Sequence, residues 1–297
     1  MKPNPVLKKL GYSDDDKLVI IHTDDIGMCQ ASLDAFADLW DFGTISSGAT
    51  MVPCPWFPAT AEWCRAHPDV DMGVHATLTS EWDAYRWSPI STVDRASGLF
   101  DDEGFFHRLA APIQAGAELD FVRVEVQAQY DRALQFGVDP THIDAHMLTI
   151  LHPRLLPAYI ETATKAKVPF MLPRNSAEMA TWMGYETQVA EGLGELIEQV
   201  EAQGVPLVDR FDSLPLDDPA DHIGLTKKIL SGLEPGITYL VLHPSTDTPE
   251  LRAICPDWPS RVANYNAMMS REVKDFIKNE GIQVIGYRAL RDLLRGE

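Results

Sequence analysis

Short apolar runs with β-strand character recur along this chain, and stretches of helical length separate most of them. The predicted strands cover residues 18–25, 44–52, 70–78, 142–147, 168–173, 205–211, 237–244 and 282–287. Helices are expected over residues 32–40, 57–66, 119–136, 153–166, 186–203, 219–232 and 261–279. Apolar strands joined by helical crossovers are typical of a parallel sheet that is buried on both faces. In a chain of 297 residues, this order predicts an α/β fold with a (β/α) barrel, and an open doubly wound sheet is the alternative.

Glycines mark several of the expected helix ends. Gly43, Gly137 and Gly281 each follow a helical stretch and precede a predicted strand, where a left-handed residue commonly ends a helix. The chain has no internal repeat, low-complexity segment or linker, so residues 1–297 are expected to form a single domain.

One connection is much longer than the others. Residues 80–118 follow the third predicted strand and contain several aromatic side chains, among them Trp82 and Trp87. A loop of this length in a compact domain is usually functional, so its rings could form a lid that stacks on a sugar. A hydrophobic plug that covers one end of the barrel explains the same aromatic content. The sequence leaves both interpretations open.

Composition limits the partners and the compartment. With 25 Lys and Arg against 44 Asp and Glu, the formal charge is −19, which argues against nucleic acid and against an anionic membrane surface. No apolar run approaches the roughly 18–20 residues of a membrane span. The 4 cysteines include no C-x-x-C pair, and the N-terminal residues lack the apolar core of a signal peptide. We therefore expect reduced thiols and a cytoplasmic location.

Polar side chains stand where the predicted strands end. The first strand ends in His22-Thr23-Asp24-Asp25, and later strands end at or near His75, Asp144, His146, Arg174, Asp209 and His243. Active sites of parallel barrels lie at the carboxyl ends of the strands, so this set is expected to converge. A bare Asp-Asp pair before Gly27 is also a common turn former and helix cap, and read alone it is a weak signal.

Three of the nine histidines are the best candidates for a metal site. His75, His146 and His243 each end an apolar strand, whereas His22 and His142 are expected to be packed core residues. One carboxylate with two imidazoles suits Zn²⁺ and tolerates Mn²⁺, Fe²⁺ or Co²⁺, whereas Mg²⁺ prefers oxygen ligands. A second carboxylate beside such a site can act as a general base in hydrolysis.

These residues resemble the motifs of the YdjC-like (ChbG) carbohydrate deacetylases. The family's A-D-D-F-G, T-S-x-x-x-M-V, G-x-H-x-x-L-T, D-x-H and H-P are matched by Thr23–Gly27, Ile45–Val52, Gly73–Thr79, Asp144–His146 and His243–Pro244. The resemblance covers residues 17 to 290, and the order and spacing of the motifs are more specific than any one of them.

The resemblance implies a distorted TIM-like barrel that removes an N-acetyl group from a small sugar such as a chitooligosaccharide. By position, Asp25, His75 and His146 resemble the metal ligands. Asp24 resembles the general base and His243 the acid that protonates the leaving amine. The resemblance also implies an arginine near the base, loosely matched by Arg174, Mg²⁺ as an alternative to Zn²⁺, and a possible homodimer.

Two departures from the family pattern fall beside these residues. Leu148 stands where the family commonly has a second histidine, and Ile26 replaces the phenylalanine that follows the Asp pair. Both leave the expected ligands intact, but they put the identity of the substrate in doubt. A metal-dependent hydrolase of another ester or phosphoester, or a sugar-binding protein without catalysis, are the alternatives.

Overall fold

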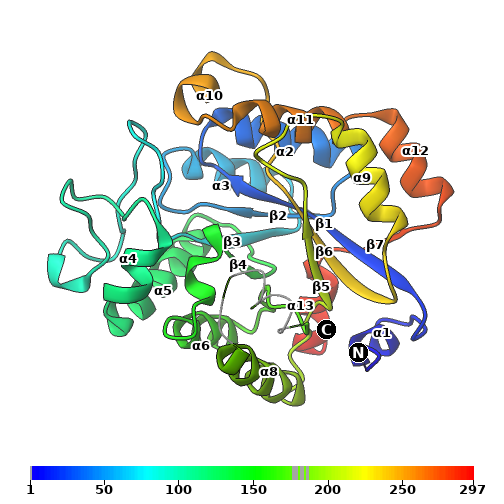
Figure 1. Cartoon of the computed structure of the whole chain (residues 1–297), viewed down its shortest axis with the longest axis horizontal. Helices are drawn as coiled ribbons and strands as arrows, with labels where there is room; N and C mark the ends of the chain where they lie inside the picture. Colours follow the sequence, from blue (N-terminus) through cyan, green and yellow to red (C-terminus); the bar gives the residue numbers. More distant parts are fainter. Residues whose placement is uncertain (1, 176–179, 181–183, 185–186) are drawn as a thin grey trace.

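Seven parallel strands form the central sheet of the computed structural model, which describes residues 2–175, 180, 184 and 187–297 (Figure 1). The strand order is β4-β3-β2-β1-β6-β5, and β7 pairs with the beginning of β1. The strands are β1 (Lys17–Ile26), β2 (Ser47–Thr50), β3 (Met72–Ala76), β4 (Ile143–Ala145), β5 (Arg210–Ser213), β6 (Gly236–Leu242) and β7 (Gln283–Val284).

In the view of Figure 1, α2, α3 and α11 lie above the strands, and α5, α6 and α8 lie below them. The crossover helices are α2 (Gln30–Phe42), α3 (Phe57–Ala66), α5 (Leu119–Gln135), α6 (Leu156–Ala166), α8 (Thr187–Ala202) and α9 (His222–Ser231). The remaining helices are α1 (Pro5–Lys9), α4 (Ala110–Gly116), α10 (Pro249–Ile254), α11 (Trp258–Met268), α12 (Arg271–Asn279) and α13 (Tyr287–Arg295).

The sheet curls so that its two edge strands approach each other through the segment 168–175. Phe170 forms an isolated parallel bridge with Ile143 of β4, and Pro173 forms another with Val208, just before β5. The predicted strand at 168–173 is therefore reduced to single bridges, because Pro169 and Pro173 have no N–H for a continuous ladder. The distorted barrel that the family resemblance implied is confirmed.

The predicted helix ends are confirmed where the chain must turn, with φ of 77° at Gly43, 83° at Gly137 and 64° at Gly281. Two predictions near the C-terminus were too simple. The expected helix over 261–279 is two helices, because the Ser270 side chain accepts the Glu272 N–H and starts α12. The last strand, predicted over residues 282–287, has only two residues, Gln283 and Val284, and α13 begins at Tyr287.

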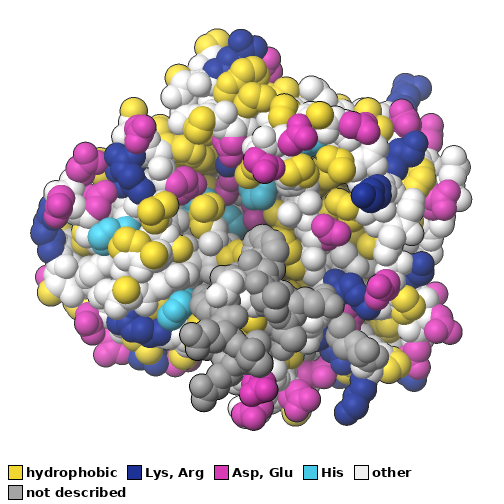
Figure 2. All heavy atoms as spheres, viewed as in Figure 1, with side chains coloured by type: hydrophobic (Ala, Val, Ile, Leu, Met, Phe, Trp, Pro, Cys, Tyr) yellow, Lys and Arg dark blue, Asp and Glu magenta, His cyan; other side chains and the backbone are white. Residues whose placement is uncertain are grey.

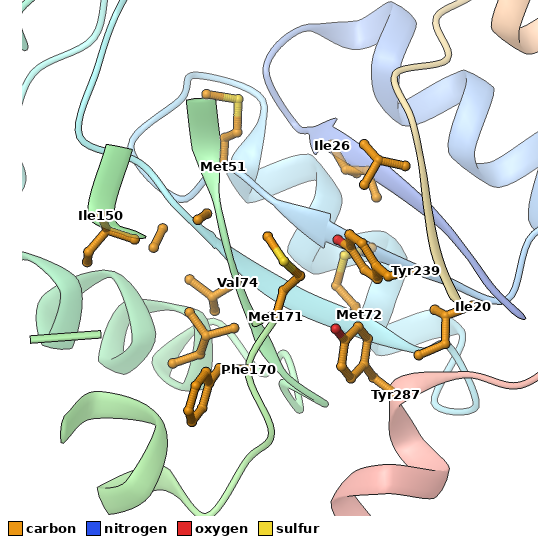
Figure 3. Packing of buried hydrophobic residues seen from close by; sticks show 14 of the residues in the cluster. Ile20, Ile26, Met51, Met72, Val74, Ile150, Phe170, Met171, Tyr239 and Tyr287 are labelled. Carbon is orange, nitrogen blue, oxygen red and sulfur yellow. The ribbon is translucent and has the colours of Figure 1, made fainter. Parts of the chain in front are cut away.

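The barrel interior is packed with aliphatic, sulfur-containing and aromatic side chains (Figure 3). All seven residues of β6 are buried, as expected for the central strands of a parallel sheet. The four cysteines are free and buried. Among the described residues, no helix combines the length and the apolar character that crossing a bilayer requires.

Strand register brings the polar strand ends to one place. β1 pairs with β6 from Lys17↔Gly236 to Thr23↔Leu242, so Asp24 and His243 directly follow the last pair. β3 pairs with β4 in a register that sets His75 opposite Asp144. The carboxyl ends of these four strands therefore carry the predicted site residues side by side.

Candidate active site

A cavity of about 300 Å³ opens at the carboxyl ends of the strands. Its acidic lining residues are Asp24, Asp25, Glu81 and Asp144, and His146 and His243 also line it. Much of the remaining lining is apolar and includes Met147, Leu148, Met171, Phe211, Leu214 and Leu216. Figure 2 shows histidine and acidic side chains gathered in a hollow near the centre of this face.

Three potential metal ligands meet beside this cavity. Asp25 Oδ1 lies 3.4 Å from His75 Nε2 and 3.1 Å from His146 Nδ1, and these two nitrogens are 3.3 Å apart. All three side chains are buried. Apart from these two ring nitrogens, no donor among the described residues reaches Asp25 Oδ1, so this oxygen can bind a cation together with them. The structure thus brings together the three residues that the family resemblance suggested as ligands.

A bend in the backbone allows both adjacent aspartates to face the site. Asp25 has a φ of 61°, which is rare for a residue other than glycine, and the β1–β2 register shifts between Thr23 and Ile26. Gly27 follows with a φ of 81°, and a Cβ there would lie 2.7 Å from Thr60 Oγ1. The glycine after the Asp pair is therefore required by both backbone conformation and space.

Carboxylates behind the two imidazoles fix their orientation. Asp144 Oδ1 lies 2.6 Å from His75 Nδ1, so the opposite nitrogen, Nε2, points into the triangle. Glu81 lies 3.1 Å from His146 Nε2 and leaves His146 Nδ1 facing Asp25. Such outer carboxylates are typical of histidine metal ligands, and Glu81 was not singled out from the sequence.

The pKa values of the two histidines report the negative charge around them. Burial alone lowers the pKa of His75, but Asp144 and Asp24 outweigh burial, so its pKa is well above the ordinary value. Burial likewise opposes protonation of His146, and Glu81 with Asp25 raises its pKa to about 9. In the absence of a cation, this cluster of carboxylates therefore attracts protons onto the imidazoles.

Arg261 of α11 holds the other oxygen of Asp25. Its guanidinium Nη1 lies 2.7 Å from Asp25 Oδ2, and it also pairs with Asp257 one turn earlier on the helix. Burial raises the pKa of Asp25, but Arg261 and the two imidazoles outweigh burial and hold it well below the ordinary value. Asp25 is thus kept ionised and oriented. No motif around Arg261 could have identified this residue from the sequence.

His243 and Asp24 lie across from each other at the cavity. His243 Nε2 is 3.8 Å from Asp24 Oδ2, and the His243 side chain is 20% exposed. The His243 backbone N–H donates to Asn264 Oδ1 at 3.0 Å, which anchors the strand end to α11. Burial lowers the pKa of His243 from its ordinary value, although Asp25 and Asp24 oppose the shift. His243 therefore releases a proton more readily than an exposed histidine.

Arg174 does not join this group. It pairs with Asp209 Oδ1 at 2.7 Å and with Glu201 Oε1 at 2.6 Å, and it is not among the residues that line the cavity. Its expected position near the base is corrected by the structure, in which Arg261 is the arginine beside the aspartates. The strand end is close to the site, but the carboxylate partners of Arg174 draw its side chain elsewhere.

Trp82 and Trp87 belong to the protein interior. They are 7% and 3% exposed, and neither lines the cavity. Their rings pack edge to face at 5.4 Å, the Arg261 guanidinium lies over Trp82, and Trp87 contacts His146. The expectation that these two indoles stack on a sugar is therefore corrected, and their packing fits the hydrophobic plug.

Comparisons with known proteins agree with the motifs. A family model for YdjC-like protein matches residues 18–279. The chain is 30% identical over 289 residues to a carbohydrate deacetylase from Thermus thermophilus, which covers 97% of this chain and 99% of that protein. It is 27% identical over 166 residues to a chitooligosaccharide deacetylase from Yersinia enterocolitica, over 55% of this chain and 62% of the relative.

A solved structure supports the same fold. The crystal structure of an Enterococcus faecalis protein named for cellobiose-phosphate cleavage matches with a TM-score of 0.74 at 22% identity, over 93% of this chain and 99% of that one. The family match over most of the sequence and the full-length relative from Thermus thermophilus together show that this chain belongs to the YdjC-like protein family.

Proposed function

We propose that this protein is a metal-dependent deacetylase that removes the N-acetyl group from a small acetylated sugar. The observation that carries the proposal is the triangle of Asp25, His75 and His146, whose ligand atoms lie within hydrogen-bonding range of one another. The names of the two relatives, a carbohydrate deacetylase and a chitooligosaccharide deacetylase, support the choice of substrate.

The edges of the triangle fit a divalent cation. Ligand bonds of about 2.0–2.1 Å separate the ligand atoms by about 3.3 Å in a tetrahedral site and by about 2.9 Å in an octahedral one. The observed edges of 3.1, 3.3 and 3.4 Å match the tetrahedral value better. Together with the two nitrogen ligands, this favours Zn²⁺, and Mg²⁺ is the alternative that the family resemblance implies.

A cation held there would acidify water and polarise the acetyl carbonyl. Asp24, which is not part of the triangle, is the proposed general base that accepts the proton of the attacking water. His243, on the other side of Asp24 Oδ2, is the proposed acid that gives a proton to the departing amine. Arg261 holds Asp25 in place so that Asp25 binds the cation and Asp24 stays free for proton transfer.

The apolar part of the cavity is suited to the methyl group and the C–H face of a sugar derivative. Leu148, at the position where the family commonly has a histidine, lines this part of the cavity. Met147 and Leu148 both have positive φ, 51° and 52°, so an unusual backbone turn presents them there. The leucine in place of a histidine at position 148 is expected to affect which sugar is accepted.

The test is acetate release from N-acetylated mono- and disaccharides by the purified protein, with and without added Zn²⁺. Acetate release that depends on the metal supports the proposal. A metal-loaded protein that hydrolyses simple acetate esters but none of the acetamido sugars would instead favour the ester hydrolase. Binding of the sugars without any release of acetate would favour a sugar-binding protein.

A further inference from the structure

A chain of buried polar groups runs through the barrel interior and ends at Asp24. Thr141 Oγ1 lies 2.5 Å from Asp71 Oδ1 and 2.9 Å from His142 Nδ1. His142 Nε2 lies 2.9 Å from His22 Nε2, and His22 Nδ1 lies 2.8 Å from Asp24 Oδ1. Thr141, His142 and His22 are 0% exposed, so this chain is shielded from solvent. Its hydrogen bonds must therefore be satisfied within the protein.

Asp71, at the end of this series of hydrogen bonds that is remote from Asp24, determines the direction of the first hydrogen bonds. The Asp71 carboxylate accepts the backbone N–H of Arg288 and the hydroxyl of Ser47, and it also accepts the hydroxyl of Thr141. A hydroxyl has one proton to donate. Because Thr141 gives that proton to Asp71, its oxygen can only accept, and His142 must donate from Nδ1.

The tautomer of His142 determines the direction of its hydrogen bond with His22. Burial, together with the neighbouring His22, holds the pKa of His142 well below the ordinary value, so the ring is neutral and carries one N–H. With that proton on Nδ1, the Nε2 atom of His142 is an acceptor. His22 therefore donates from its own Nε2. The His142 ring fills the space that a side chain at Gly73 would need, since a Cβ there would lie 2.5 Å from the ring, and Tyr287 stacks on the ring at 4.0 Å.

The other nitrogen of His22 also requires a proton. His22 Nδ1 lies 2.8 Å from Asp24 Oδ1 and 2.8 Å from the Tyr239 hydroxyl oxygen, and Tyr239 donates its own proton to Asp144 Oδ2. A bare nitrogen here would face the Asp24 carboxylate oxygen at 2.8 Å with no proton between them, which is repulsive. Tyr239 and Tyr287 lie near each other in the interior, with their ring centroids 5.8 Å apart (Figure 3).

We propose that His22 is a positioning residue that donates its Nδ1–H to Asp24 Oδ1 and so leaves Oδ2 as the oxygen that accepts the proton in catalysis. Asp24 Oδ2 is the oxygen that faces the site, 3.7 Å from His75 Nε2 and 3.8 Å from His243 Nε2. Asp144 Oδ2 also lies 3.6 Å from His22 Nε2, so a carboxylate lies near each nitrogen of the His22 ring. This inference rests on the proposed function, because Asp24 is its proposed base.

Two substitutions at one position separate the two nitrogens of His22. The side-chain amide of His22→Asn can place a donor where Nδ1 stands, facing Asp24, whereas that of His22→Gln reaches the position of Nε2, facing His142. We expect His22→Asn to keep kcat within about threefold of the wild type. We expect His22→Gln to lose about 10- to 100-fold in kcat, with unchanged KM and metal content, because a general base that is no longer held in position accepts the proton less efficiently. Equal kcat values for the two variants would overturn the proposal.

A spectroscopic measurement on the wild type does not depend on how the variants fold. In the protein labelled with ¹⁵N-histidine and loaded with Zn²⁺, we expect His22 to show protons on both ring nitrogens, with the Nδ1 proton shifted far downfield. Its signals are assigned by their absence from the His22→Asn spectrum or, if that variant does not fold, by through-space contacts to Tyr239. A His22 ring without a proton on Nδ1 would refute the proposal. Failure of the wild type to release acetate would refute the proposed function but not this hydrogen-bond chain.

Discussion

Asp144→Asn tests whether the carboxylate behind His75 strengthens metal binding. Asp144 is 1% exposed and accepts two hydrogen bonds, from His75 Nδ1 at 2.6 Å and from the Tyr239 hydroxyl at 3.0 Å. The asparagine oxygen can still accept from His75, but the bond is no longer assisted by charge, and the NH₂ group then faces the tyrosine. The imidazole becomes a weaker ligand, because the same negative charge raises its pKa.

The expected loss is about 10- to 100-fold in Zn²⁺ affinity, which corresponds to about 1.4–2.8 kcal/mol. The assay is competition for Zn²⁺ against a chromophoric chelator at fixed pH. Asp120→Asn is the matched control, because Asp120 is an exposed partner of Arg123 on the surface, and its affinity should equal that of the wild type. A folded Asp144→Asn protein that binds Zn²⁺ as tightly as the control would refute the reasoning.

Three further predictions concern the same site. Gly27→Ala should lower the free energy of unfolding, measured by urea denaturation, by about 1–3 kcal/mol, because φ is 81° and a Cβ would lie 2.7 Å from Thr60. Gly192→Ala is the control and should be neutral or stabilising, because Gly192 lies on α8 with open space around it. Equal effects of the two substitutions would contradict this account of the turn. Zn²⁺ affinity, measured by calorimetry, should fall from pH 9 to pH 6 by about tenfold per pH unit for each proton that the metal displaces. The reason is that the pKa values of His75 and His146 are raised, so protons compete with the metal for these nitrogens. A pH-independent affinity would exclude these ligands. Asp24→Asn should lower kcat by about 10²–10⁴-fold and keep its metal, and an active variant would exclude Asp24 as the base.

The convergence of the site could be predicted because it depends on strand ends. Asp25, His75 and His146 follow three short apolar runs, and the carboxyl ends of parallel strands meet at one edge of the barrel. The helical crossovers and the glycines that end them were predicted for the same reason, since local patterns specify them. The weak strand at 168–173 was overestimated, because its two prolines limit the hydrogen bonds it can form.

Side-chain direction beyond the strand ends could not be predicted. Arg174 ends a run of strand character, but the positions of Asp209 and Glu201, which draw it away, depend on tertiary packing. Arg261 lies on a helix far along the chain, and its contact with Asp25 depends on how α11 packs. Tertiary packing likewise decides that the two indoles of the long loop point inward.

The two interior histidines show the same limit. His22 and His142 were expected to be packed core residues, and both are fully buried. The sequence indicated that these side chains are packed in the core, but it could not show that their Nε2 atoms meet at 2.9 Å. That contact depends on the register across β1, β2, β3 and β4 and on the absence of a side chain at Gly73.

The most direct test of the account is anomalous diffraction at the zinc edge from crystals of the protein loaded with Zn²⁺. We predict a single strong peak per chain, bound by Asp25 Oδ1, His75 Nε2 and His146 Nδ1. Zinc content measured on the same preparation should be one equivalent and should be lost in His75→Ala. An ion bound at other residues, or no bound ion at saturating Zn²⁺, would contradict the central claim that these three side chains form a metal site.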